Sequence, residues 1–412
     1  MNQPASAPRD PYAAFRLRDY RSFSVVVFLS AILQQTQSVA LGWDVYDRTG
    51  SAMALGLVGL VQFLPAALFF LPAGAIADRF DRRKVMVGTL ALWCAASVGL
   101  AAAEIAGAST LWLYVWAALS MTANVVNRPA RDALLPQLVP AAVFPNAVVW
   151  NTSLYQIASI SGPALAGMLI AAYGQASIVY SLNAALTLLA LLLASRIRDP
   201  HKESARQSRS WGDVFGGLTY VRRTPIVLGV MTLDLLAVLL SSATALLPLY
   251  ARDILHVGPS GLGWLSAAPA VGALCMAYMQ SVRQPRHVGR AFFLALAGYG
   301  AATVLFGVST SFWLSLVALV AIGALDNVNV VIRQVVVQIY TPDELRGRVS
   351  AVNRVFITSS NQLGAFFAGG VATLATPVFA VTAGGVATVL VVLAGLRAFP
   401  ELRRLGRLTE RL

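Results

Sequence analysis

Acidic side chains inside long apolar segments are the residues of this sequence best suited to proton chemistry. Asp234 lies nine residues after the start of the apolar run 225–250. An unpaired charge at that depth in a bilayer is costly, so such a residue is a functional candidate. We expect Asp234 to be the first choice for proton coupling, with a neutral or ion-paired structural role as the alternative. Asp44 and Asp326 are further candidates.

Polar residues also follow one face of the apolar run 22–46. The stripe has helical spacing and consists of Ser30, Gln34, Gln37, Leu41 and Asp44. A polar stripe inside a membrane must face a cavity or another helix. We expect it to line a substrate cavity, with Asp44 near the outer end. The alternative for Asp44 is the membrane interface beside Asp47. Asn151 and Tyr155, one helical turn apart, are further cavity candidates.

Two polar clusters are related by an internal repeat. A shift of 202 residues places Asn124 on Asp326 and aligns the following segments without a gap. The matched pairs are Asn127 with Asn329, Arg131 with Arg333, Pro140 with Pro342, Asn151 with Asn353, Gly162 with Gly364 and Gly167 with Gly369. Polar helix ends that pair in one state and separate in another form a bistable element. We therefore expect a gate or latch at these clusters, with substrate contact as the alternative.

A short charged loop joins the apolar runs 53–77 and 85–106. Its distinctive residues are Gly74, Asp78, Arg79, Arg82 and Arg83. Any loop on the positively charged side of a membrane collects arginine, which is the alternative reading. The matching loop of the second half, 281–290, keeps its arginines but has no acid. We expect an asymmetric latch.

The apolar run 144–171 carries a set of small residues around a proline. They are Ala158, Gly162, Pro163, Ala166 and Gly167. Small residues let membrane helices approach closely, and Pro163 removes one hydrogen bond inside its helix. An ordinary packing face is the alternative to a specialised role.

The sequence shows few signs of metal, disulfide or phosphate chemistry. The three histidines fall in predicted loops, and Cys94 and Cys275 lie in different halves, so neither a metal site nor a disulfide is indicated. There is no glycine-rich phosphate loop ending in Lys-Ser or Lys-Thr. We expect no cofactor, no metal and no enzymatic activity.

Composition places the chain in a membrane. Of its residues 57% are hydrophobic and only 12% are charged, whereas about a quarter are charged in a soluble domain. Runs long enough to cross a bilayer fall at 22–46, 53–77, 85–106, 109–130, 144–171, 175–195, 225–250, 259–281, 289–308, 311–334, 349–374 and 377–397. The sequence therefore predicts an all-α integral membrane protein with twelve transmembrane helices.

The longest polar interruption divides these spans into six and six. The predicted parts are an N-terminal segment 1–21, a six-helix bundle 22–195, a linker 196–224, a second bundle 225–397 and a basic tail 398–412. Trp211, Phe215 and Leu218 in the linker have helical spacing, which predicts a short helix on the membrane surface.

Charge then predicts the orientation. With both termini on one side, only Arg48 and Arg252 of the 31 Lys and Arg residues fall on the other. Because positive charge is retained on the cytoplasmic face, we expect both termini there. The net charge of +13 is explained in this way and requires no nucleic acid.

These motifs resemble those of the major facilitator superfamily. The loop 74–84 is similar to the Gly-x-x-x-Asp-Arg-x-x-Arg-Arg/Lys loop of these transporters, and 158–167 is similar to their antiporter motif, with alanine at two small positions. The segments 42–50 and 138–167 resemble the branch that includes enterobactin-type siderophore exporters and macrolide-type efflux proteins. The resemblance implies two pseudo-symmetric six-helix bundles that rock around a midplane site. It also implies that Gly74 allows close helix packing, that the loop's charges latch helix ends, and that substrate is exported in exchange for protons. For the latch, the resemblance implies that Asp78 meets the segment 347–350 and that Arg82 meets Asp132.

We therefore expect a secondary active transporter of the bacterial inner membrane. Its substrates would be amphipathic small molecules, drugs or siderophores, its coupling ion the proton, and its functional unit a monomer in the lipid bilayer. An uptake symporter or facilitator of the same fold, acting on a small metabolite, is the alternative. A membrane enzyme would require several convergent acids or histidines near one face, and the sequence has no such group.

Overall fold

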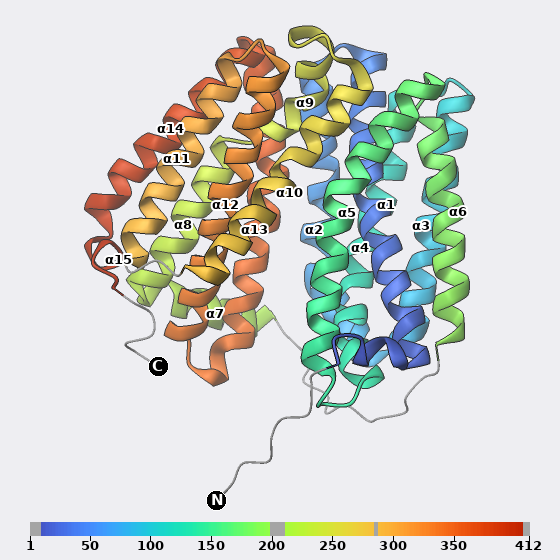
Figure 1. Cartoon of the computed structure of the whole chain (residues 1–412), viewed down its shortest axis with the longest axis horizontal. Helices are drawn as coiled ribbons and strands as arrows, with labels where there is room; N and C mark the ends of the chain where they lie inside the picture. The colour runs from blue at the N-terminus through green and yellow to red at the C-terminus, as the bar shows by residue number, and fades with distance from the viewer. Residues whose placement is uncertain (1–9, 198–210, 284–286, 407–412) are drawn as a thin grey trace, which may run out of the picture.

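The computed structural model describes residues 10–197, 211–283 and 287–406, apart from the side chains of Leu71, Asp78 and residues 211–215. Within these ranges the chain is almost entirely helical and contains no strand. The helices form two bundles that stand side by side, with both termini at the same end (Figure 1). We call this the terminal end of the molecule and the opposite one the far end.

The first bundle contains six long helices. They are α1 (Arg18–Thr49), α2 (Ala52–Arg79), α3 (Arg82–Ile105), α4 (Thr110–Leu138), α5 (Phe144–Tyr173) and α6 (Ser177–Arg196), preceded by the 3₁₀ turn η1 (Ala13–Arg16). The second bundle begins with α7 (Trp211–Arg223), the helix predicted in the linker. It continues with α8 (Pro225–Leu240), η2 (Ala243–Leu246), α9 (Leu247–Leu249), η3 (Tyr250–Ile254), α10 (Gly258–Val282), α11 (Val288–Val308), α12 (Phe312–Tyr340), α13 (Asp343–Leu374), α14 (Pro377–Ala398) and α15 (Pro400–Arg403).

Twelve segments of this fold have the length of a membrane span. In the described part of the chain, ten of them are also apolar enough to cross a bilayer by length and composition, counting Pro225–Ile254 as one. The other two, α4 and α13, are 29 and 32 residues long. Both are more polar, since α4 carries Arg128, Arg131 and Asp132, and α13 carries Asp343, Glu344, Arg346, Arg348 and Arg354.

Among the described residues, the two bundles share a hydrophobic core only near the far end. One buried cluster there joins Leu41 and Ala166 of the first bundle to Tyr250 and Ala368 of the second. Toward the terminal end each bundle has its own cluster, with Leu90 in one and Val336 in the other. The bundles are therefore joined at the far end and packed separately at the terminal end, as their arrangement in Figure 1 also shows.

Close helix contact across this junction depends on small residues. Helix α2 packs against α13, and α5 packs against α10. At Gly369 of α13, an added Cβ would lie 2.6 Å from the Ala52 carbonyl oxygen and 2.7 Å from the Gly56 Cα. Packing of this kind drives helix association in lipid, where apolar burial alone gives little.

The seventh span differs from the continuous run 225–250 predicted from the sequence. Helix α8 stops at Leu240, and the chain continues through short turns to Ile254. Ser241 Oγ donates to the Gly384 carbonyl at 3.0 Å, and Pro248 cannot continue a helical hydrogen-bond ladder. The Pro248 ring instead packs toward Gly42 of α1. This break directs the segment after Pro248 toward the first bundle.

Candidate functional site

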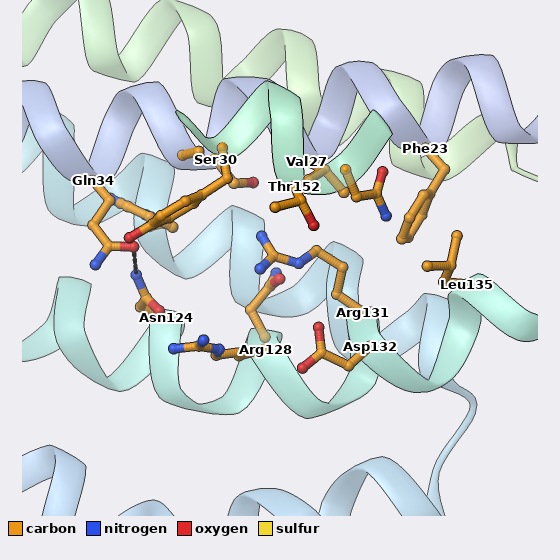
Figure 2. A pocket seen from close by; sticks show the side chains of 15 residues that line it. Phe23, Val27, Ser30, Gln34, Asn124, Arg128, Arg131, Asp132, Leu135 and Thr152 are labelled. Carbon is orange, nitrogen blue, oxygen red and sulfur yellow. Dashed lines mark hydrogen bonds between the residues drawn. The ribbon is translucent and has the colours of Figure 1, made fainter. Parts of the chain in front are cut away.

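A pocket of about 270 Å³ opens among α1, α4 and α5 in the terminal-end part of the first bundle. This size is near the lower limit for small-molecule pockets. Helix α1 contributes Phe23, Val27, Ser30, Ala31 and Gln34; α4 contributes Asn124, Asn127, Arg128, Arg131, Asp132 and Leu135; α5 contributes Asn151, Thr152 and Tyr155, with Trp93 from α3. Figure 2 shows how these side chains surround the space. The lining mixes charged, amide and aromatic groups, which suits an amphipathic solute.

Most of the cavity candidates from the sequence lie in this pocket. Ser30, Gln34, Asn151 and Tyr155 all line it. Gln34 accepts a hydrogen bond of 3.1 Å from the Asn124 amide, drawn as a dashed line in Figure 2. Gln37 is placed differently, because its side-chain oxygen is occupied by the Trp93 indole N–H at 2.9 Å inside the bundle.

The gate candidates of the first half lie in the same pocket. Asn127 donates to Thr89 Oγ1 at 2.7 Å, which fixes it against α3. Arg131 extends from α4 into the space, and Asp132 follows it on the same helix (Figure 2). Arg128 also lines the pocket but was not singled out from the sequence. The sequence could have pointed to Arg128, because a residue three positions before Arg131 lies on the same face of the helix.

The equivalent cluster of the second half is organised around a buried ion pair. Arg333 of α12 donates to Asp234 of α8, and both side chains are about 95% buried. Asp234 is therefore ion-paired, which was the alternative to its expected role as a free, protonatable acid. Neither polar atom of the Asn329 side chain has a hydrogen-bond partner in the described residues. Asp326, one turn before Asn329, has no ion pair or hydrogen bond within that same part of the chain.

Asp44 lies inside the first bundle at the far end and does not line the pocket. Its carboxylate accepts hydrogen bonds from Arg48 Nε at 2.5 Å and from the Tyr180 hydroxyl at 3.2 Å. Arg48 also donates to the Ala108 carbonyl at 2.8 Å. The group ties α1 to α6 and to the loop after α3, so it fits a structural ion pair.

The charged loop between α2 and α3 holds the helix ends of the first bundle. Asp81 accepts from the Arg83 backbone N–H at 2.8 Å and thereby caps α3. Arg82 donates to the Ala133 carbonyl at 3.2 Å, one residue after the expected partner Asp132. Arg83 donates to the Ser195 carbonyl at the end of α6.

The other half of the expected latch is not assembled at the described residues. The side chain of Asp78 lies outside them. A Cβ added at Gly74 or at Gly347 would meet nothing within 4 Å. The close packing expected at Gly74 is therefore absent in this conformation, because α2 and α13 approach each other at their far ends.

The small-residue motif of α5 faces two neighbours. Gly162 faces α1, where an added Cβ would lie 2.7 Å from Gln35 Cβ. Gly167 faces α10 of the other bundle, where a Cβ would lie 2.7 Å from the Gly263 Cα. Ala158 and Pro163 are buried in the same helix. The motif therefore forms part of the junction between the bundles.

Polar contacts complete this junction at the far end. Arg252 forms an ion pair of 2.8 Å with Asp47, and Tyr46 donates a hydrogen bond to Asp253. Both contacts join α1 to η3, which the break after α8 brings to this position. Sequence reasoning missed them because the partners are more than 200 residues apart. The only hint was that Arg252 is one of two basic residues expected on this side.

Comparisons with known proteins agree with this architecture. The family model described as "Transmembrane secretion effector" matches residues 9–405. The multidrug efflux pump Tap of Mycobacterium tuberculosis is 30% identical over 346 residues, covering 80% of this chain and 81% of its own. The enterobactin exporter EntS of Escherichia coli is 26% identical over 405 residues, covering 93% and 92% respectively.

Solved structures share the fold at low sequence identity. The nucleoside transporter NupG superposes with a TM-score of 0.70 at 14% identity, covering 93% of this chain and 99% of its own. A bacterial homolog of the human lysosomal transporter Spinster, inward-facing and occupied, gives a TM-score of 0.72 at 16% identity, covering 98% and 99%. The chain therefore belongs to the transmembrane secretion effector family of the major facilitator superfamily, and it is a multi-pass membrane transporter with two six-helix bundles rather than an enzyme.

Proposed function

We propose that the protein exports amphipathic small molecules, drugs or siderophores among them, in exchange for protons. The observation that carries this proposal is the pocket among α1, α4 and α5, which combines charged, amide and aromatic groups in a membrane transporter. The relatives named as a multidrug efflux pump and an enterobactin exporter support the outward direction.

The proposed cycle alternates access by rocking the two bundles. In this structure the far end is closed by Gly369 against Gly56, by Gly167 against Gly263 and by the Asp47–Arg252 ion pair. The pocket lies on the terminal-end side of these contacts. Loading therefore occurs from the terminal end, and release requires that the far-end contacts separate while the loop at Gly74 closes on α13.

We place the protein in the inner membrane with both termini in the cytoplasm. This assignment rests on the charge distribution, since Arg48 and Arg252 are the only basic residues expected at the far end. With this orientation the pocket loads from the cytoplasm, as an exporter requires.

For proton coupling we favour Asp326 over Asp234. Asp234 is neutralised by Arg333, so protonating it would leave a buried guanidinium without its partner. Asp326 forms no ion pair or hydrogen bond with any described residue. A carboxylate without a fixed partner can gain and lose a proton at lower structural cost.

Transport in inverted membrane vesicles tests this proposal. An imposed proton gradient, acidic inside, is expected to drive accumulation of fluorescein, an organic anion, or ethidium, an organic cation. Accumulation of neither probe, or accumulation only in right-side-out vesicles, would contradict proton-driven export. Asp326→Asn is expected to abolish coupling to the gradient, whereas Asp343→Asn, an exposed acid at the start of α13, should not. Unchanged coupling in Asp326→Asn would exclude that residue.

A further inference from the structure

The pocket of the first bundle has an excess of positive charge. Among its lining residues, Arg128 and Arg131 are cationic and Asp132 is anionic, which leaves a net charge of +1. None of these three side chains forms a hydrogen bond or an ion pair within the described residues. Arg131 is partly buried and Arg128 is exposed. An arginine within a membrane-spanning segment that has no ion pair usually faces a water-filled cavity or a ligand path. The pocket therefore holds guanidinium donors that no described protein group occupies.

The internal repeat allows the arginines of the two halves to be compared. Arg131 corresponds to Arg333 of the second half. There the first helix of the bundle, α8, supplies Asp234 and neutralises the arginine. In the first half the equivalent contact is between α1 and α4, and α1 offers only Ser30, Gln34 and apolar groups to the pocket. Arg333 has a carboxylate in direct contact, whereas Arg131 has only the electrostatic attraction of Asp132, without an ion pair or hydrogen bond in the described residues. The Arg131 guanidinium can therefore bind a group that enters the pocket.

Neighbouring groups complement a ligand that is partly aromatic and partly charged. Tyr155 is 46% exposed, and its hydroxyl has no hydrogen bond within the described part of the chain. The Gln34 amide uses its oxygen for Asn124 and keeps its N–H groups free. Figure 2 shows the Arg131 side chain reaching across the pocket toward Thr152. A ring can stack near Tyr155 while an anionic group meets the two guanidinium groups.

We propose that this pocket selects solutes that carry an anionic group, such as a carboxylate, sulfonate or phosphate, and that Arg128 and Arg131 bind that group. The proposal rests on the proposed transport function, because it names the substrate class of the same pocket. Guanidinium groups match such anions in a planar, two-point geometry. Hydrogen bonds of this kind are charge-assisted and stronger than neutral ones, so losing them should weaken binding at least roughly tenfold.

Binding of a matched probe pair tests the proposal separately from transport. The probes are 2-naphthoate and 2-naphthamide, which share one ring system and differ in charge. The full-length protein is studied in nanodiscs of phosphatidylcholine alone, so that no anionic lipid headgroup competes. Wild-type protein is expected to bind naphthoate at least tenfold more tightly than naphthamide. The double variant Arg128→Gln/Arg131→Gln should lose this preference, and Asp132→Asn should increase it.

Two controls keep the outcome clear. Arg283→Gln removes an exposed arginine outside the pocket and should keep the preference. Thermal unfolding checks that the double variant is folded.

Two results would overturn the proposal: no preference for naphthoate in the wild type, or a preference that persists in the folded double variant. If anionic lipid added to the discs abolishes naphthoate binding in the wild type, the arginines serve lipid headgroups and the proposal also fails. Export of ethidium without naphthoate preference would reject the anion site alone, and naphthoate preference without proton-driven export would reject the transport proposal alone.

Discussion

The far-end junction can be tested by adding a single methyl group where the bundles touch. In Gly369→Ala, the new Cβ would lie 2.6 Å from the Ala52 carbonyl oxygen, whereas ordinary contacts begin at 3.4 Å. Helices α2 and α13 must therefore separate by roughly 0.8 Å, and overpacking of this kind costs about 1–3 kcal/mol. This cost applies only to the state in which the junction is closed. The ratio of far-end-open to far-end-closed molecules should rise between about fivefold and 150-fold.

Gly370→Ala is the matched control for this change. A Cβ at Gly370 would meet nothing within 4 Å, although it lies next to Gly369 in the same helix. Both variants gain the same helix propensity, about 1 kcal/mol, in both states, so that effect cancels. Spin labels at Ala106→Cys and Leu374→Cys, with Cys94 and Cys275 replaced by serine, report the separation of the far ends. Equal distance distributions in the two variants would refute the close packing described at Gly369.

Two further predictions concern charged residues. Arg333→Gln leaves Asp234 buried without its partner, so the free energy of unfolding should fall by about 3–5 kcal/mol. Adding Asp234→Asn removes the unpaired charge and should restore most of this stability, as measured by thermal unfolding. If the double variant shows no recovery, the buried ion pair is contradicted. Asp78→Asn is expected to slow transport while the amount of folded protein stays nearly unchanged, because its proposed role is to close the terminal end; wild-type transport rates would contradict the latch.

The spans of the fold could be predicted because each depends on the composition of one continuous segment. The break after Leu240 could not, because the Ser241 hydroxyl bonds to Gly384, more than 140 residues away. The apolar runs lie close to the bounds of most helices in the structure, but run length alone treats every apolar run as one regular helix. Tertiary hydrogen bonds are what end α8 early.

The pocket was predictable where polar residues share a helix face, as Ser30 and Gln34 do. Gln37 lies on the same stripe but is turned to Trp93, a contact that depends on how α3 packs beside α1. The partner of Asp234 depends on the relative position of α8 and α12, which no local spacing encodes. The residue of the second half that corresponds to Arg128 is not an arginine, so comparison of the two halves did not point to Arg128.

The single excess positive charge of the pocket has an electrical consequence. Moving one elementary charge through a membrane potential involves about 2.3 kcal/mol per 100 mV. The empty pocket carries that charge whenever the bundles rock, whereas a bound monovalent anion cancels it. The loaded and the empty transporter should therefore respond differently to voltage, with the reorientation of the empty form as the voltage-sensitive step. The neutral Asp234–Arg333 pair adds no charge of its own, so the second bundle would contribute only through the protonation state of Asp326.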